Sequence, residues 1–266
     1  MGIGTERYQR RQIAKQELLG ILKNERSVVV IHYSCESFYD RPNGSSPRIT
    51  SIAVRNLASA QTSSFSIHQV AERAGVAHGD IEQNYDRLEK MMLSEFYGYV
   101  ATHKESKWLH WNMRDANYGF PALSHRFKVL GGQPDDIHES NLCDLARLLI
   151  ALYGPGYVGH PRLANLMKAN AISDKDFLTG PKEAEAFSNK EYVKLHQSTL
   201  RKVDVMDNIV GRLTAGTLKT NAAWRDIHGS LIGYMGELLR DHPLMLILAF
   251  VASIASIASV ILWFVR

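Results

Sequence analysis

The chain has 266 residues, of which 45 % are hydrophobic and 22 % are charged, an ordinary globular composition that is long enough for one substantial core. The net charge of +4 permits binding to nucleic acid or to an anionic lipid surface but does not require it. The only cysteines, Cys35 and Cys143, lack the spacing of a metal-ligand pair, so the composition favours a reducing compartment and argues against a disulfide or a zinc site.

The first part of the chain predicts a helix followed by three strands. Thr5–Asn24 is charged and amphipathic, which is not the pattern of a secretory signal. Ser27–Tyr33 is a β-branched, nearly continuous apolar run, as expected for a central strand that is buried on both faces. Arg48–Asn56 and Thr62–Gln69 read as two further strands, and the three together predict an antiparallel meander.

Helices and one further strand follow. Asp80 and Gln83 have the spacing of a capping box, which predicts the start of a long amphipathic helix. The next strand begins near Trp108, and the helix after it is led by a proline. The glycine-rich stretch 154–159 follows a helix instead of a strand, so it is not interpreted as a phosphate-binding loop. Further helices are expected at Leu142–Leu152, Pro161–Asn170, Glu191–Leu213 and Asn221–Asp241.

The most informative stretch is Lys107–Gly131, in which a short hydrophobic strand breaks at Asn112 and leads through a polar loop into a helix. Later positions of the same pattern are Tyr118, Pro121, Leu123 and Arg126. This stretch resembles the second motif of the DEDD 3′–5′ exonucleases and of the proofreading domains of DNA polymerases. In that family an Asp precedes the helix, and this chain has Gly119 at the corresponding position.

The resemblance extends over roughly Val28–Leu213 and implies an α/β fold with a ribonuclease-H-like mixed sheet flanked by helices. A C-terminal transmembrane helix is expected after it, from the hydrophobic composition of the last residues. The expected domains are an N-terminal helix (1–25), an exonuclease-like domain (26–215), a helical connector (216–243) and a membrane anchor (244–265).

In this family, two metal ions held by four carboxylates hydrolyse a phosphodiester bond, and Mg²⁺ or Mn²⁺ suits such oxygen ligands. The first motif is Asp-x-Glu on a strand, where alternate residues share a face. Here Ser34 replaces the Asp and Glu36 is retained. In the second motif Gly119 replaces the Asp, and Asp115 either reaches the site from the loop or is a solvated acid.

The last motif falls on the late helix. Asp204 followed by Val205 matches the final metal ligand of the family, so Glu36 and Asp204 are the predicted metal ligands. The positions of the family's general base hold Leu200 or Thr199 instead. His196 lies two helical turns before Asp204 and is either a replacement base or a solvated surface residue.

The resemblance also implies nucleic-acid contacts for Asn112, Tyr118 and Arg126. Aromatic residues crowd the mouth of the expected cleft, where they either stack on bases or belong to the core. These residues are Trp108, Trp111, Tyr118 and Phe120.

The segment Leu244–Val265 contains no charged residue over about 22 positions, where about 20 span a bilayer. We therefore expect a membrane anchor, the alternative being a buried core helix. Only Arg266 follows it, which predicts a single-pass, tail-anchored protein with a cytosolic N-terminal domain. Small residues at four-residue spacing within the span favour a homo-oligomer, although such residues are common in membrane helices.

Three functional hypotheses follow. The favoured one is a membrane-tethered, catalytically degenerate exonuclease-like domain, a pseudoenzyme, that binds single-stranded nucleic acid, a nucleotide or a protein partner. The second is an active Mg²⁺- or Mn²⁺-dependent exonuclease with a rearranged site of Glu36, Asp115 and Asp204. The third is a structural membrane adaptor that carries no functional cleft.

Overall fold

The computed structural model describes residues 3–37, 46–114, 117–229, 235, 247, 248 and 250–257. The chain divides into two compact units. The larger unit consists of Leu18–Leu149 and Val158–Thr220, and it contains the sheet and the predicted site. The smaller unit consists of Met1–Glu17, Ile150–Tyr157 and Asn221–Arg266.

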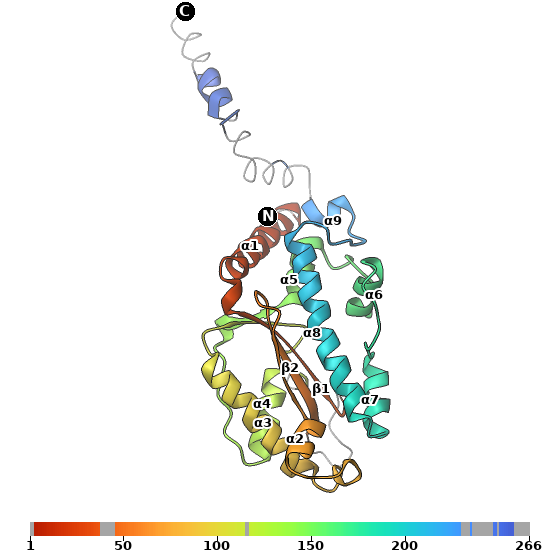
Figure 1. Cartoon of the computed structure of the whole chain (residues 1–266). Coiled ribbons are helices and arrows are strands. Elements are labelled where there is room, and N and C mark those ends of the chain that lie inside the picture. Colours follow the sequence, from red (N-terminus) through yellow and green to blue (C-terminus); the bar gives the residue numbers. More distant parts are fainter. Residues whose placement is uncertain are drawn as a thin grey trace, which may run out of the picture. The chain divides into compact units, whose positions relative to one another are not determined.

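A five-stranded mixed sheet forms the centre of the larger unit (Figure 1). The strands are β1 (Val28–Cys35), β2 (Ile49–Asn56), β3 (Thr62–Ser66), β4 (Lys107–His110) and β5 (Leu142–Asp144). Their order is β3-β2-β1-β4-β5, with β2 antiparallel to both neighbours and β4 parallel to β1 and β5. The predicted α/β class, the antiparallel meander and the interior position of the first strand are confirmed.

The alternation of side chains along β1 separates an apolar face from a polar one. Val29, Ile31, Tyr33 and Cys35 belong to the main hydrophobic core, together with residues of the helices on that face. Those helices are α2 (Ile67–Arg73), α3 (Tyr85–Thr102) and α4 (Phe120–Val129). Their buried residues, such as Leu88, Met92 and Phe96 of α3, recur at three- and four-residue intervals, which explains why these segments are helical and dock on the sheet.

The other face of β1 carries His32 and Ser34, and α8 (Tyr192–Thr214) covers it. Contacts of α8 with β1 and β2 hold this helix along the sheet, and α7 (Gly180–Ser188) packs beside it (Figure 1). The helix α6 (Arg162–Ala169) precedes α7 in the chain. The buried face of α8 includes Ser198, Thr199 and Lys202, so the sheet and this helix enclose polar groups between them.

The smaller unit contains most of α1 (Ile3–Leu22), the end of α5 (Leu145–Tyr153) and α9 (Trp224–His228). Arg7 donates a hydrogen bond of 2.5 Å to the carbonyl of Ala151, and Arg11 donates one to the carbonyl of Leu152. Both carbonyls lie in the last turn of α5, where cations favour the negative end of the helix dipole.

Several predicted elements differ from the structure. The third strand ends at Ser66, and Ile67 begins α2, so the expected strand through Gln69 is too long. Residues Leu142–Asp144 form β5 instead of helix, because they pair in parallel with β4. Asp80 ends a short 3-10 turn, and α3 begins at Tyr85 without a side-chain cap, so the predicted capping box is wrong. The helix α7 was not predicted.

The predicted anchor Leu244–Val265 lies largely outside the described residues. Of this segment, the structure describes residues 247, 248 and 250–257, which are helical. Among the described parts of the chain, no helix combines the length and the apolar composition needed to cross a membrane. The predicted helix Asn221–Asp241 differs from the structure, because residues 221–223 are not helical, α9 begins at Trp224, and Gly229 ends it with a φ of 73°. Met235 is helical, and residues 230–234 and 236–241 lie outside the described residues.

Candidate functional site

Ser34 stands on β1 where the resemblance implies the first metal ligand, and it is surrounded by hydroxyl groups. Its Oγ donates to Glu183 Oε1 on α7 at 2.9 Å and lies 2.8 Å from Thr199 Oγ1 on α8. Thr199 Oγ1 lies 2.5 Å from Ser51 Oγ on β2. All four side chains are buried. At the position of the expected carboxylate, the structure therefore has a hydrogen-bonded cluster of three neutral hydroxyl groups and one acid, Glu183.

That acid, Glu183, forms an ion pair with Lys202 of α8. The distance from Lys202 Nζ to Glu183 Oε2 is 2.7 Å, and both side chains are only 7 % exposed. Ser198 Oγ also donates to Glu183 Oε1, at 3.1 Å. Three donors thus satisfy the carboxylate, as a buried charge requires, because desolvation of an unpaired ion costs several kcal/mol. The ammonium of Lys202 also lies 5.5 Å from the centre of the Phe177 ring.

A cavity of about 370 Å³ adjoins this pair. Its size lies near the lower end of the range for small-molecule sites, roughly 300–1,000 Å³. Besides Glu183 and Lys202, the lining combines aromatic and basic side chains: Trp111, Tyr118, Phe177, His160, Arg162 and His32.

His32 lines this cavity, and its ring contacts Tyr118. Tyr118 Oη donates to the carbonyl of Tyr33 at 3.2 Å, and a carbonyl can only accept. His32 Nδ1 lies 3.3 Å from the same hydroxyl oxygen, Tyr118 Oη. The other ring nitrogen, Nε2, is buried and has no hydrogen-bond partner among the described residues. Burial, with a contribution from Lys202, holds the pKa of His32 well below its usual value, so the ring is neutral.

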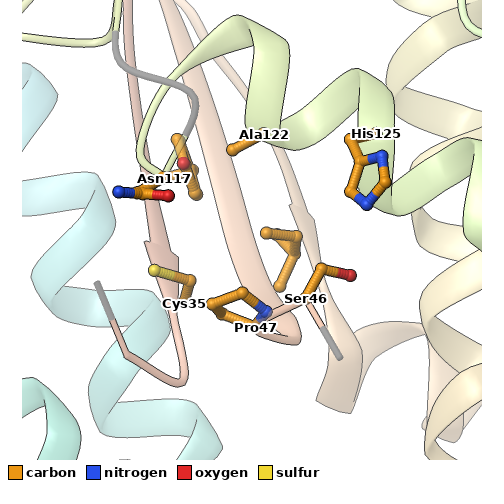
Figure 2. Close-up of a pocket in the computed structure, with 8 residues that line it drawn as sticks. Cys35, Ser46, Pro47, Asn117, Ala122 and His125 are labelled. Atoms are coloured by element: carbon orange, nitrogen blue, oxygen red, sulfur yellow. The ribbon is translucent and has the colours of Figure 1, made fainter. Parts of the chain in front are cut away.

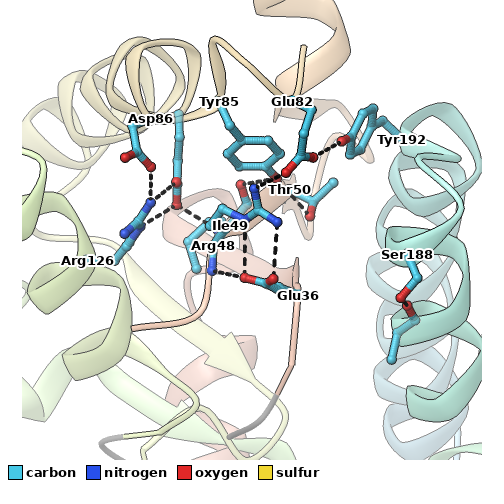
Figure 3. A network of polar contacts seen from close by, with 12 residues as sticks. Glu36, Arg48, Ile49, Thr50, Glu82, Tyr85, Asp86, Arg126, Ser188 and Tyr192 are labelled. Atoms are coloured by element: carbon cyan, nitrogen blue, oxygen red, sulfur yellow. Dashed lines mark hydrogen bonds and ion pairs between the residues drawn. The ribbon is translucent and has the colours of Figure 1, made fainter. Parts of the chain in front are cut away.

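Glu36, a predicted metal ligand, is held by Arg48 (Figure 3). Arg48 Nη2 lies 3.1 Å from Glu36 Oε1, and Arg48 Nη1 lies 2.7 Å from Glu82 Oε1. The guanidinium also stands 4.6 Å from the ring centre of Tyr85 and 4.9 Å from that of Phe187. Two carboxylates and two rings therefore surround this arginine, and Glu36 serves as one of its counter-ions.

Asp204, the other predicted metal ligand, forms ion pairs with Arg201 and, at 3.8 Å, with Arg55. Arg55 pairs across the sheet with Val30, near the start of β1, whereas Glu36 follows the end of this strand. Six residues at about 3.3 Å each separate these two positions by about 20 Å along β1. Glu36 and Asp204 are thus not brought together.

Asp115, the predicted third acid, lies outside the described residues. Among the residues that the structure does describe, no three acidic, histidine or cysteine side chains gather where they could hold a metal ion. The described acids therefore do not fit the paired-metal site of the exonuclease family.

His196 is not the solvated surface residue that the sequence allowed as one alternative. It is only 6 % exposed, its ring centre lies 5.2 Å from that of His68, and its Nε2 lies 3.3 Å from Ser64 Oγ. Burial, together with the neighbouring His68, lowers the pKa of His196 to about 4. The ring is therefore neutral near pH 7.

The three predicted nucleic-acid contacts are divided between the cavity and the core. Asn112 and Tyr118 both line the cavity. Arg126 is 3 % exposed, and its Nη2 lies 2.6 Å from both Glu89 Oε2 and Asp86 Oδ1. Its guanidinium therefore joins α4 to α3. Of the four aromatic residues named from the sequence, Trp111 and Tyr118 line the cavity, whereas Trp108 and Phe120 belong to or pack against the core.

Gly119 leaves no room for the aspartate of the family motif. Its φ of 146° is a conformation that residues with a side chain rarely adopt, and a Cβ would lie 2.3 Å from the carbonyl carbon of Met113. The backbone N–H of Gly119 donates to Tyr33 Oη at 2.8 Å. The turn between β4 and α4 is therefore built around a glycine.

A second pocket, beside Cys35, is too small for an organic ligand (Figure 2). It has a volume of about 30 Å³, room for little more than one water molecule. Burial raises the pKa of the Cys35 thiol to about 12, so this sulfur is not a nucleophile near neutral pH.

Three residues that line this site, His32, Glu183 and Lys202, were not predicted from the sequence. Two of these residues are recognisable in the sequence pattern. His32 interrupts the continuous apolar run of the first strand, and Lys202 falls on the buried stripe of α8, between Leu195 and Met206. Glu183 lies on the unpredicted helix α7, where no pattern marked it.

No family model matches the chain, and neither a curated protein nor a solved structure shows a significant similarity to it.

Proposed function

We propose that the chain is a membrane-tethered, catalytically degenerate member of the ribonuclease-H-like class of DEDD exonucleases, and that it binds a nucleotide or the end of a single-stranded nucleic acid. The order of elements supports the class. An antiparallel meander of β1–β3, a long helix, β4 and several later helices follow one another as the resemblance implies.

The observation that carries the loss of catalysis is the cluster around Ser34. A hydroxyl takes the position of the first carboxylate, and the ammonium of Lys202 lies 2.7 Å from the nearby acid Glu183. A fixed cation beside the buried acid leaves no ligand set for a divalent metal ion there, because such a site needs several anionic oxygens. The cavity of about 370 Å³ supports a binding function over a purely structural adaptor, whose cleft would be filled by side chains.

Two assays on the full chain in detergent micelles test this proposal. We expect weak or absent degradation of single-stranded DNA with Mg²⁺ or Mn²⁺, and binding of a fluorescent single-stranded oligonucleotide or of a mononucleotide. The opposite outcome is robust, metal-dependent degradation that Glu36→Gln abolishes. That result would favour the active exonuclease with Glu36, Asp115 and Asp204.

A further inference from the structure

Two histidines join α2 to α8, one of them half-buried and the other buried. His68 of α2 and His196 of α8 have their ring centres 5.2 Å apart, with an angle of 60° between the ring planes. His196 is 6 % exposed, and its Nε2 lies 3.3 Å from Ser64 Oγ of β3. Besides α8, the helix α2 contacts α3 and β3, so this histidine pair is part of what holds α2 in place (Figure 1).

The contact suits neutral rings and not charged ones. A protonated imidazole has an N–H on each nitrogen, and in both rings Nδ1 is buried without a partner among the described residues. Protonation of both rings therefore leaves two buried donors unsatisfied and places two cations next to each other. Burial lowers the pKa of both histidines, and His68 lowers that of His196 further. Both rings are thus neutral near pH 7 and bind a proton more readily once they are separated.

The charged groups around the histidine pair offer little compensation for added protons. Glu72, one turn after His68 on α2, favours protonation of that ring, but Glu72 is exposed and water screens it. His78, in the 3-10 turn that follows α2, opposes protonation, and β3 carries no titratable side chain. Carboxylates on neighbouring elements have cationic partners of their own: Glu89 and Glu95 of α3 with Arg126 and Arg73, Asp204 and Asp207 of α8 with Arg201 and Arg55, and Glu183 of α7 with Lys202.

An apolar face keeps α2 on the domain at neutral pH. Ile67, Val70 and Ala71 are buried in the main core. The helix has only seven residues, too few to be stable on its own, so loss of its contact with α8 weakens the whole element.

We propose that the histidine pair is a pH-dependent contact, which holds α2 on α8 near neutral pH and releases α2 at about pH 5–6 when both rings are protonated. The released form exposes Ile67 and Val70, so acidification gives the domain a new apolar surface. This regulation goes beyond the proposed binding function and does not depend on the ligand of the cavity.

The sign follows from proton linkage. Each histidine binds a proton more weakly in the closed form than in the released form, in which its pKa is about 6.5. The closed form is therefore favoured above that pH and loses this advantage as the pH falls. The ratio of released to closed form should rise by about tenfold per pH unit for each histidine that is protonated only on release.

Amide hydrogen exchange of the full chain in detergent micelles, measured by mass spectrometry between pH 7.5 and 5, tests the proposal. After correction for the intrinsic exchange rate, peptides from Ile67–Asp80 should lose protection by about tenfold or more per pH unit below about pH 6. Peptides from β1 should stay protected over the same labelling times, because release of α2 leaves this strand paired on both sides.

Three variants and a control assign the effect to the histidine pair. His68→Gln and His196→Gln each remove one titrating group, so the pH dependence should fall from about hundredfold to about tenfold per pH unit. The double variant should lose the dependence. His125→Gln, at an exposed position of α4, should behave like the unmodified chain.

The inference is overturned if α2 keeps its protection at pH 5, or if α2 and β1 lose protection together, as in global unfolding. Both of these outcomes need only the unmodified chain, so they decide the question even where a variant does not fold. A double variant that folds and retains the pH dependence of the unmodified chain would also overturn it.

Discussion

At the scale of single residues, the Glu183–Lys202 pair gives a direct prediction about stability. Glu183→Gln leaves the ammonium of Lys202 buried without its counter-ion, so we expect the free energy of unfolding to fall by about 3–5 kcal/mol. The double variant Glu183→Gln with Lys202→Met removes both charges at similar volume and should cost less than the single change. Denaturant titration measures both quantities.

An exposed pair at the start of α8 is the control. Glu191 and Lys194 lie 2.8 Å apart, with side chains 40 % and 53 % exposed, so Glu191→Gln should change the free energy of unfolding by less than about 0.5 kcal/mol. If Glu183→Gln and Glu191→Gln lower the free energy of unfolding equally, the buried Glu183–Lys202 pair does not stabilise the fold more than an exposed pair does.

His196 predicts how stability depends on pH. Its pKa is about 4 in the folded chain and about 6.5 when unfolded, so below pH 6.5 the unfolded state binds the extra proton. Stability is therefore retained above that pH and lost as the pH falls toward 4, by about 3 kcal/mol from this residue. His196→Gln should reduce the slope of unfolding free energy against pH in this window.

His125→Gln makes the same substitution at an exposed position of α4 and is the matched control. A slope that is the same in His196→Gln and in the unmodified chain would mean that His196 does not titrate as its burial against His68 requires.

At the scale of elements, the backbone conformation at Gly119, between β4 and α4, determines whether the aspartate of the family motif can be introduced there. Gly119→Asp should not recover metal-dependent nuclease activity. It should lower the free energy of unfolding by about 2 kcal/mol or more, because a side chain at φ 146° is strained and collides with Met113. Ser124→Asp, on the helix that follows, should cost less. A stable Gly119→Asp variant that gains activity would contradict this account.

The same scale shows what the sequence could predict and what it could not. Val28–Cys35 and α8 were predictable, because long apolar runs and three- to four-residue spacing report burial directly. The strand β5 was not predictable, because three residues are too few to show an alternating pattern of apolar side chains. Their strand conformation depends on pairing with β4. The site was mislocated for a similar reason. The spacing of the motif matched Asp204 to the last metal ligand of the family. In the structure, however, the residue of α8 that contacts Ser34 is Thr199.

At the scale of the whole molecule, the C-terminal segment sets the expected location. Leu244–Val265 has no charge to oppose insertion, since a central charge costs roughly 2.5–3.5 kcal/mol on insertion scales. We expect the full chain to fractionate with membranes and to resist extraction by high salt. Removal of residues 243–266, or Ile254→Arg together with Ile257→Arg, should release a folded, soluble protein. A full chain that is soluble without detergent would disprove the tail anchor.

The pairing of Glu36 with Arg48 has a consequence for engineering. The backbone N–H of Glu36 donates to the carbonyl of Arg48 at 2.8 Å, and their side chains form an ion pair, so the chain leaving β1 and the chain entering β2 are fastened to each other. The stability of the fold should then depend little on the length of the connection, because each doubling of the number of residues in a closed loop costs only about 0.6 kcal/mol of loop-closure entropy. We therefore expect an epitope, or a small fluorescent domain whose own termini are adjacent, to be tolerated in the connection between Glu36 and Arg48, with little change in the thermal midpoint. Such an internal reporter leaves both ends of the chain intact, including the predicted anchor.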